Sequence, residues 1–411
     1  MEPQPTISFD NTEYAFAYKS DKDLKKARFL FKTMAIGWLV KIGTRITPPL
    51  IRWGLPIKGL IRNTIFKQFV GGETLEQTAV VADKLEEYGV RVILDYGVEG
   101  GDYGEESLNH SCNEFIKVIN YAATQANIPF MSVKVTGITR FSLLEQLDER
   151  MHASGKESLV KRYEAALATL NENDRKEWDN TCNRMRRICD AAKQHHIGVL
   201  IDAEETWIQD PVDALVMLMM DEYNKQHALL YNTVQLYRHD RLAFLKDSYA
   251  AAAERNFILG MKLVRGAYME KERKRAADNN YPSPIQPDKE ATDRDFNLAV
   301  AFCTEHINRI AFIVATHNEH SSLLATQLMQ QKCLPLNHPH LHFSQLYGMS
   351  DNITFNLARG GCSVSKYLPF GPIKDVVPYL MRRAQENTSV AGQTGRELGL
   401  INKELARRKI G

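Results

Sequence analysis

The sequence lacks the features by which several classes of protein are recognised. Its six cysteines form no Cys-x-x-Cys pair, so neither a disulfide framework nor a zinc site is indicated, and free thiols in a reducing compartment are expected. No segment reaches the roughly 18 uncharged apolar residues that a membrane-spanning helix requires. The first residues carry neither a secretory leader nor an Arg- and Ser-rich presequence. These absences predict a cytoplasmic protein that is not integral to a membrane.

The sequence also has very little net charge. The 411 residues include 52 basic and 50 acidic side chains, a formal charge of +2, which gives no reason to expect a nucleic-acid partner. Residues 24–72 are a local exception, because they contain ten Lys or Arg and no acid, interleaved with Phe and Trp. Such a basic amphipathic segment is typical of peripheral binding to an anionic membrane surface. The alternative is that its apolar faces pack on the rest of the protein.

The composition is otherwise that of a folded protein, with 44% hydrophobic and 25% charged residues. Short apolar, β-branched runs alternate with longer helical patterns, as expected for a covered parallel sheet. The eight runs are 90–96, 130–136, 197–202, 233–237, 257–264, 310–316, 341–346 and 362–367. Eight repeats favour a (β/α)8 TIM barrel within the α/β class, and a doubly wound sheet is the alternative.

Three regions are expected along the chain. A helical N-terminal arm covers residues 1–88, and the barrel covers 89–390 with a helical insertion near 140–196. A C-terminal tail covers 391–411.

In a barrel, functional residues collect at the carboxyl ends of the strands. Polar or unusual residues occur there in most of the eight runs. They are Lys134, Asp202, Ala203, Gln235, Lys262, Arg265, Gly266, Ala267, Tyr268, Thr316, His317, Asn318 and Tyr367. Lys134 is predicted to lie inside a strand. Buried charges are costly unless they are paired or bind a ligand, and an ion pair between Lys134 and Asp202 is one way to satisfy both.

The last helical pattern contains two adjacent arginines, Arg382 and Arg383, followed by Glu386. Arginine suits two-pronged binding of a carboxylate. Neighbours on a helix diverge by about 100°, so both meet one ligand only if the helix caps the barrel mouth. A solvated surface pair is the ordinary alternative.

Two other motifs are weaker. The glycines at 97, 100, 101 and 104 do not form a dinucleotide fingerprint, and the acids beside them would repel phosphate. His338, His340 and His342 could align on a strand, but no acid is nearby, and no metal is expected.

Four motifs together resemble flavin-dependent proline dehydrogenases, in family order and over about residues 90–387. They are Lys262-Leu263-Val264-Arg265-Gly266-Ala267-Tyr268, Ala315-Thr316-His317-Asn318, Gln345-Leu346-Tyr347-Gly348-Met349-Ser350-Asp351, and Tyr379-Leu380-x-Arg382-Arg383-x-x-Glu386-Asn387. The helical N-terminal part and Pro284-Ile285-Gln286-Pro287 are similar to the single-function branch. With no presequence, a bacterial member is expected.

The resemblance implies a distorted barrel that holds FAD non-covalently and passes a hydride from proline C5 to flavin N5. The product is Δ1-pyrroline-5-carboxylate, the first intermediate of proline catabolism, and the electrons go to a quinone. Arg382 and Arg383 would bind the proline carboxylate, with Glu386 orienting them and Tyr367 against the ring. Lys134 would reach the other carboxylate oxygen.

The same resemblance implies the flavin contacts and the groups nearest the reaction. The flavin would be lined by Ala203, Gln235, Lys262, Arg265, Gly266, Ala267, Tyr268, Thr316, His317 and Asn318. Lys134, Asp202 and Lys262 would be the catalytic set. Some bacterial members read Arg-Leu-Val-Lys where this chain reads Lys-Leu-Val-Arg, so either Lys262 or Arg265 could touch the isoalloxazine ring.

Three alternatives stay open. A hydroxyproline dehydrogenase is disfavoured by the bulk of Tyr367, which should crowd a ring hydroxyl. A Schiff-base lyase using Lys134 or Lys262 needs a lysine of depressed pKa, and Asp202 would act against that. A non-catalytic binding protein does not explain the complete motif set.

Overall fold

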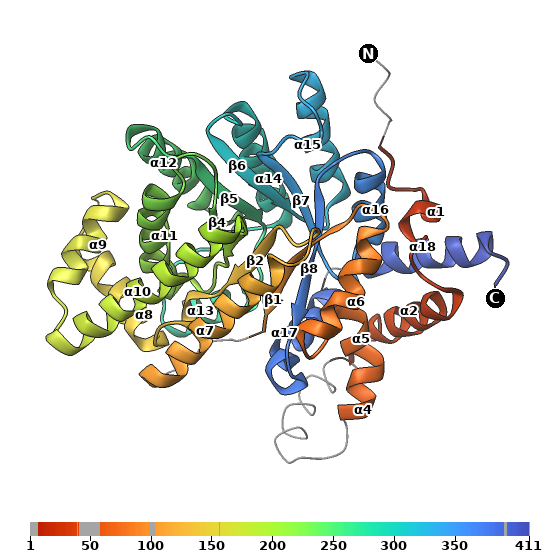
Figure 1. Cartoon of the computed structure of the whole chain (residues 1–411), viewed down its shortest axis with the longest axis horizontal. Coiled ribbons are helices and arrows are strands. Elements are labelled where there is room, and N and C mark those ends of the chain that lie inside the picture. Colours follow the sequence, from red (N-terminus) through yellow and green to blue (C-terminus); the bar gives the residue numbers. More distant parts are fainter. Residues whose placement is uncertain are drawn as a thin grey trace. The chain divides into compact units, whose positions relative to one another are not determined.

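The computed structural model describes residues 7–38, 40, 58–97, 103–155, 157–389 and 393–410, without the side chains of 58, 60, 385–389, 393 and 394. Its eight strands form a closed barrel in sequence order (Figure 1). They are β1 Arg91–Tyr96, β2 Phe130–Val133, β3 Gly198–Ile201, β4 Leu230–Gln235, β5 Leu259–Val264, β6 Ile310–Ala315, β7 Leu341–Leu346 and β8 Val364–Phe370. The predicted barrel is confirmed, and the doubly wound alternative is wrong.

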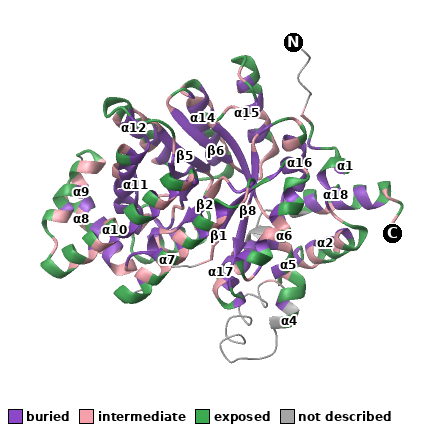
Figure 2. Cartoon of the chain, viewed as in Figure 1, coloured by how far each residue is buried: buried purple, intermediate pink, exposed green. Residues whose placement is uncertain are grey.

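The strand pairings are parallel where they are described. β4 and β5 pair with Thr233 opposite Lys262, and β1 and β8 pair with Ile93 opposite Tyr367. Gly260 is required in β5, because a Cβ atom there would lie 2.0 Å from the carbonyl oxygen of Leu230. The strands are almost entirely buried (Figure 2), as their mostly apolar sequences predict.

Helices precede the barrel and connect its strands. Those before β1 are α1 Thr12–Ala15, α2 Asp21–Met34, α4 Lys58–Ile61, α5 Lys67–Phe69 and α6 Leu75–Glu86. Those after it are α7 Glu105–Ala122, α8 Phe141–Ala153, α9 Leu159–Ala168, α10 Glu172–His195, α11 Gln209–Tyr223, α12 Arg241–Glu254, α13 Met269–Asp278, α14 Lys289–Glu305, α15 Glu319–Gln331, α16 Asp351–Arg359, α17 Ile373–Ser389 and α18 Gln393–Arg407. Among the residues described, no helix combines the length and hydropathy of a bilayer crossing.

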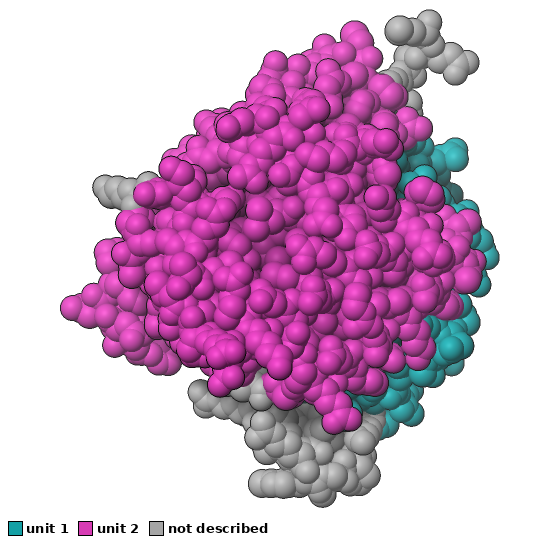
Figure 3. Space-filling model, turned by 60° about the vertical axis from the view of Figure 1, so that its left-hand side comes forward, with its two compact units in different colours: residues 1–97, 317–319, 343–411 teal, residues 98–316, 320–342 magenta. Residues whose placement is uncertain are grey.

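The chain divides into two compact units (Figure 3). Unit 1 comprises residues 1–97, 317–319 and 343–411, and unit 2 comprises residues 98–316 and 320–342. In unit 1 the apolar face of α2, with Leu24 and Phe31, belongs to one core with Leu400 and Ile401 of α18. Ser20 caps α2 by accepting a hydrogen bond from the Asp23 N–H. In unit 2, three helices (α8, α9 and α10) lie between β2 and β3.

Candidate active site

Two buried lysines share one aspartate in unit 2. Lys134 Nζ lies 3.3 Å from Asp202 Oδ2, and Lys262 Nζ binds the other oxygen, Oδ1. The three side chains are at most 12% exposed. The predicted ion pair between Lys134 and Asp202 is therefore present, and Lys262 is added to it. Because an ammonium group is costly to bury without a partner, this carboxylate fixes both lysines in place.

The prediction that Lys134 lies inside a strand is wrong. β2 ends with the pairing of Val133 and Ile201, and Lys134 begins the short 3-10 turn Val135–Gly137. The side chain therefore leaves the backbone at the carboxyl end of the strand. This is where barrel enzymes place functional groups.

Glu204 was not predicted as a site residue, although it lies two positions after Asp202. It is buried, and the Thr136 hydroxyl lies 2.9 and 2.8 Å from its two carboxylate oxygens. Burial raises the pKa of Glu204 to about 7, the nearby Glu205 adds to this, and Lys134 and Thr136 oppose it. The predicted site residue Gln235 donates from Nε2 to the Glu204 carbonyl oxygen at 2.8 Å. Ala203, between these groups, is partly exposed.

The turn after β5 holds a fixed guanidinium. Arg265 donates to Asp293 at 2.7 Å, to the Thr316 hydroxyl at 2.6 Å and to the Ser321 hydroxyl at 3.0 Å. Its guanidinium carbon also lies 4.3 Å from the centre of the Phe296 ring. Burial lowers the pKa of Arg265, which Asp293 partly offsets. Two of the predicted flavin contacts, Arg265 and Thr316, are thus joined.

The next residues of the same turn are open to a ligand. Gly266 has φ +140°, and a Cβ atom there would lie 2.4 Å from the Tyr237 ring, so glycine is required. Gly266 and Ala267 are exposed, and Tyr268 is partly exposed. Because Gly266 and Ala267 carry no more than a methyl group, the exposed backbone here is accessible to a ligand.

His317 and Asn318 belong to unit 1, as do Tyr367, Arg382, Arg383 and Glu386, whereas Lys134, the fifth residue predicted to bind substrate, belongs to unit 2. His317 Nδ1 lies 2.9 Å from the Ser350 hydroxyl, and both His317 and Asn318 are partly exposed. Ser350 was part of a motif but was not predicted to have a role. The contact fixes one nitrogen of the imidazole.

Tyr367 lies in β8 and the two arginines lie in α17. Tyr367 and Arg382 are partly exposed, whereas Arg383 is only 5% exposed and lies 5.0 Å from the Tyr379 ring. The alternative of a solvated surface pair is therefore wrong for Arg383. Glu386 is in the same helix, but its side chain lies outside the described residues.

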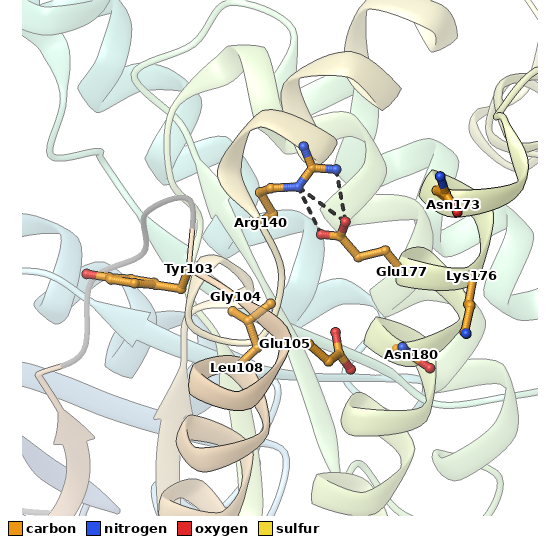
Figure 4. Close-up of a pocket in the computed structure, with 9 residues that line it drawn as sticks. All are labelled: Tyr103, Gly104, Glu105, Leu108, Arg140, Asn173, Lys176, Glu177 and Asn180. Carbon is orange, nitrogen blue, oxygen red and sulfur yellow. Dashed lines mark hydrogen bonds and ion pairs between the residues drawn. The ribbon is translucent and has the colours of Figure 1, made fainter.

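A separate cavity of about 490 Å³ lies in unit 2 (Figure 4). Arg140 is held there by Glu177 at 2.9 Å, and these hydrogen bonds raise the pKa of Arg140. Tyr103, Glu105 and Lys176 also line the cavity. None of the predicted site residues is among its lining residues.

One group of side chains in unit 2 has the composition of a metal site. Ligand atoms of Asp148, His152 and Asp210 lie within 4.8 Å of one another. Asp210 is already paired with Arg162 at 2.8 Å and with Arg241 at 3.6 Å. Because these cations neutralise one of the two carboxylates, the arrangement does not by itself indicate a metal.

Comparison with known proteins agrees with the motifs. The family model for proline dehydrogenase matches residues 79–396. The chain is 30% identical to "Proline dehydrogenase 1, mitochondrial" of Dictyostelium discoideum, over 97% of this chain and 74% of that protein. It is also 30% identical to the hydroxyproline dehydrogenase of Xenopus laevis, over 99% of this chain and 91% of that one.

A solved structure supports the fold. Proline utilization A (PutA) of Bdellovibrio bacteriovorus, inactivated by N-propargylglycine, superimposes with a TM-score of 0.69 at 19% identity. The match covers 94% of this chain and 40% of that longer one. At this identity the likeness concerns architecture alone, and it agrees with the barrel described above.

Proposed function

This chain belongs to the proline dehydrogenase family, and we propose how its residues carry out that family's reaction, the oxidation of L-proline to Δ1-pyrroline-5-carboxylate. The chain is thus an oxidoreductase that acts on proline. The observation that carries the assignment of residues is the pair of buried lysines on Asp202, since Lys134 and Asp202 directly follow β2 and β3 and Lys262 lies within β5. Their cationic groups suit a small anionic substrate.

The side chains fit a flavin cofactor. Arg265, Thr316 and His317 supply cationic and hydroxyl donors of the kind that bind phosphate and stabilise negative charge on a ring. Gly266 and Ala267 are exposed and carry no more than a methyl group, so the backbone of this turn is accessible to a large planar group. When bound, FAD supplies the hydride acceptor. We assign its contacts to the full set named from the sequence: Ala203, Gln235, Lys262, Arg265, Gly266, Ala267, Tyr268, Thr316, His317 and Asn318.

The protein's part in the reaction is to hold proline C5 against the acceptor. Arg382 and Arg383 bind the proline carboxylate, and Lys134, steadied by Asp202, binds its second oxygen. Glu386 orients the arginines, since it lies three and four residues further along the same helix. Tyr367 packs against the pyrrolidine ring.

Lys262 and Arg265 have different partners, which allows their roles to be separated. Lys262 shares Asp202 with Lys134, whereas Arg265 is bound to Asp293. A cation beside the ring stabilises reduced flavin, so replacing it should lower the midpoint potential. Comparing Lys262→Met with Arg265→Met identifies which of the two lies there.

An anaerobic absorption spectrum tests the assignment. The purified protein should be yellow, and its flavin band should bleach when L-proline is added without oxygen. A colourless protein that converts a carbonyl substrate would instead indicate the Schiff-base lyase. A yellow protein that proline does not bleach would contradict the substrate.

Hydroxyproline is the second candidate substrate, because relatives named hydroxyproline dehydrogenase are as similar to this chain as those named proline dehydrogenase. The same bleaching experiment, with 4-hydroxyproline in place of proline, distinguishes the two. Faster bleaching by 4-hydroxyproline would reverse the assignment.

We further propose that a membrane quinone reoxidises the flavin, and that the basic segment 24–72 brings the enzyme to the membrane. Phe31 of α2 packs in the core of unit 1, whereas Phe29 is 70% and Trp38 63% exposed. Residues 39 and 41–57 lie outside the described part of the chain. α2 therefore has a buried apolar face, as the packing role requires, and exposed aromatic side chains are available for binding to a membrane surface.

Three basic residues of α2, Lys22, Lys25 and Lys26, also line a cavity of about 840 Å³ in unit 1. Six lysines contribute to it, against two aspartates: Lys19, Lys22, Lys25, Lys26, Lys67 and Lys84. Anionic headgroups are attracted by about 1 kcal/mol per basic residue near the surface. Co-sedimentation with anionic vesicles at low salt, and release at high salt, is expected. Equal binding to neutral and anionic vesicles would remove this proposal.

A further inference from the structure

The C-terminal helix α18 is linked to the turn that contains His317 by two consecutive residues, all within unit 1. Arg396 binds Glu319 at 2.9 Å, and Asn352 of α16 binds the same carboxylate at 2.8 Å. Glu397 accepts a hydrogen bond from the Ser350 N–H. α18 is therefore connected to the His317 turn by two separate contacts, one through Glu319 and one through Ser350.

Ser350 has an unusual conformation at the start of α16. Its φ of 51° and ψ of 45° are left-handed, which residues other than glycine, asparagine and aspartate rarely adopt. A serine before a helix ordinarily caps it through the side-chain oxygen, but Ser350 makes no such cap. Its hydroxyl instead lies 2.9 Å from His317 Nδ1. The strained backbone thus serves to direct this hydroxyl to the imidazole.

The acceptor of the Ser350 N–H is well buried. Glu397 is 4% exposed, and the charged groups around it are Asp351, Lys366 and Lys19. Burial raises the pKa of Glu397 to about 7, Asp351 raises it further, and the hydrogen bond from the Ser350 N–H and the two lysines oppose this. In either protonation state a carboxyl oxygen can accept the N–H, so the contact stabilises the left-handed turn.

We propose that Glu397 is a positioning residue of the flavin site, which holds Ser350 in the conformation that fixes the imidazole of His317. The proposal rests on the function proposed above, in which His317 contacts the flavin. Glu397 does not itself contact substrate or cofactor in this scheme. It acts through Ser350.

The same helix offers a matched control. Glu404 is also fully buried on α18, seven residues further on, but it binds Arg407 and Arg408 at 2.8 and 2.7 Å. Glu404→Ala should therefore disturb the docking of α18 without touching Ser350. Thermal unfolding of each variant reports the loss of stability that a purely structural role would cause.

The experiment measures FAD release from the holoenzyme on dilution, by the rise in flavin fluorescence. Glu397→Ala and Ser350→Ala should each release FAD about tenfold faster than the wild type, the effect of one lost hydrogen bond. Glu397→Gln, which keeps an acceptor oxygen, should behave as the wild type. Glu404→Ala should release FAD at the wild-type rate. If Glu397→Ala does not fold, Ser350→Ala and Glu397→Gln carry the test.

Variants made in a His317→Ala background distinguish positioning of the imidazole from a general destabilisation of the flavin site. There, Ser350→Ala and Glu397→Ala should have no further effect on FAD release, because the imidazole that they orient is gone. An undiminished effect in this background, or wild-type release by both single variants, would overturn the positioning role. A wild-type protein that binds no FAD would overturn the proposed function as well. Failure of the positioning role alone would leave FAD bound to the wild type.

Discussion

Replacing Glu204 by glutamine should stabilise the protein at alkaline pH but much less at acidic pH. Glu204 is buried among Thr136, Gln209 and Gln235, with the Thr136 hydroxyl 2.8 Å from one carboxylate oxygen. Burial raises its pKa to about 7, from the ordinary 4.5. The folded protein therefore binds this proton more tightly than the unfolded chain does. Stability is greatest below pH 4.5 and falls as the pH rises through 7.

The size of the effect on folding free energy follows from the difference between the raised and the ordinary pKa of Glu204. One pKa unit corresponds to about 1.4 kcal/mol, so full ionisation of Glu204 costs about 3 kcal/mol of folding free energy. Glutamine never ionises and keeps an oxygen that can accept from Thr136. Between pH 5 and pH 8 the advantage of Glu204→Gln over the wild type should grow by about 2–3 kcal/mol.

Urea unfolding of both proteins at the two pH values measures this difference. Glu397, whose pKa burial also raises to about 7, titrates in both proteins and cancels in the comparison. Glu305→Gln is the control, since that carboxylate is solvated and paired with Lys332 on the surface. Glu305→Gln should change the free energy of unfolding little at either pH. If Glu204→Gln shifts the midpoint equally at pH 5 and pH 8, the raised pKa is refuted.

Four further substitutions test the proposed substrate site. Arg382→Lys or Arg383→Lys keeps the charge but loses the two-pronged contact, so the KM for proline should rise by an amount worth about 2–4 kcal/mol while FAD stays bound. An unchanged KM in both variants would contradict the assignment. Tyr367→Ser should raise the ratio of 4-hydroxyproline to proline turnover, and a flat ratio with an unchanged circular dichroism spectrum would show that another residue sets the preference. Asp202→Ala leaves two buried lysines without their shared carboxylate and should cost about 3–5 kcal/mol. If Asp202→Ala unfolds at the wild-type urea concentration, the two lysines are not buried as charged groups.

The sequence was sufficient to predict the barrel because its strands are covered on both faces. Most of the strands are near-continuous apolar runs, and the predicted run 341–346 coincides with β7. The fourth run was placed too late, since β4 begins at Leu230 and the polar Asn232 interrupts the pattern. Asn232 is nevertheless buried, because it donates to Asp213 at 2.9 Å. A hydrogen bond to a residue far away in the chain cannot be seen in a local pattern.

The same limit explains which parts of the candidate site were missed. Lys134 and Asp202 could be paired from the sequence because both end neighbouring strands. Ser350 and Glu397 could not, since one lies in a turn and the other in a segment for which only a tail was expected. The burial of Arg383 was equally hidden, because adjacent arginines resemble a solvated surface.

The role of Glu397 in α18 has to be tested by point substitutions, because the helix also contributes to the hydrophobic core and holds the N-terminal residues. Its Leu400, Ile401 and Leu405 belong to the hydrophobic core of unit 1, and burial of each is worth about 1.5–3 kcal/mol. Arg408, just beyond its end, donates to the carbonyl oxygen of Phe16, so the helix also holds the N-terminal residues. Deleting α18 would expose that core and loosen the N-terminal helices together with the turn at Ser350. A truncated protein that loses FAD would therefore say nothing of Glu397, whereas single substitutions leave the packing in place and change one contact.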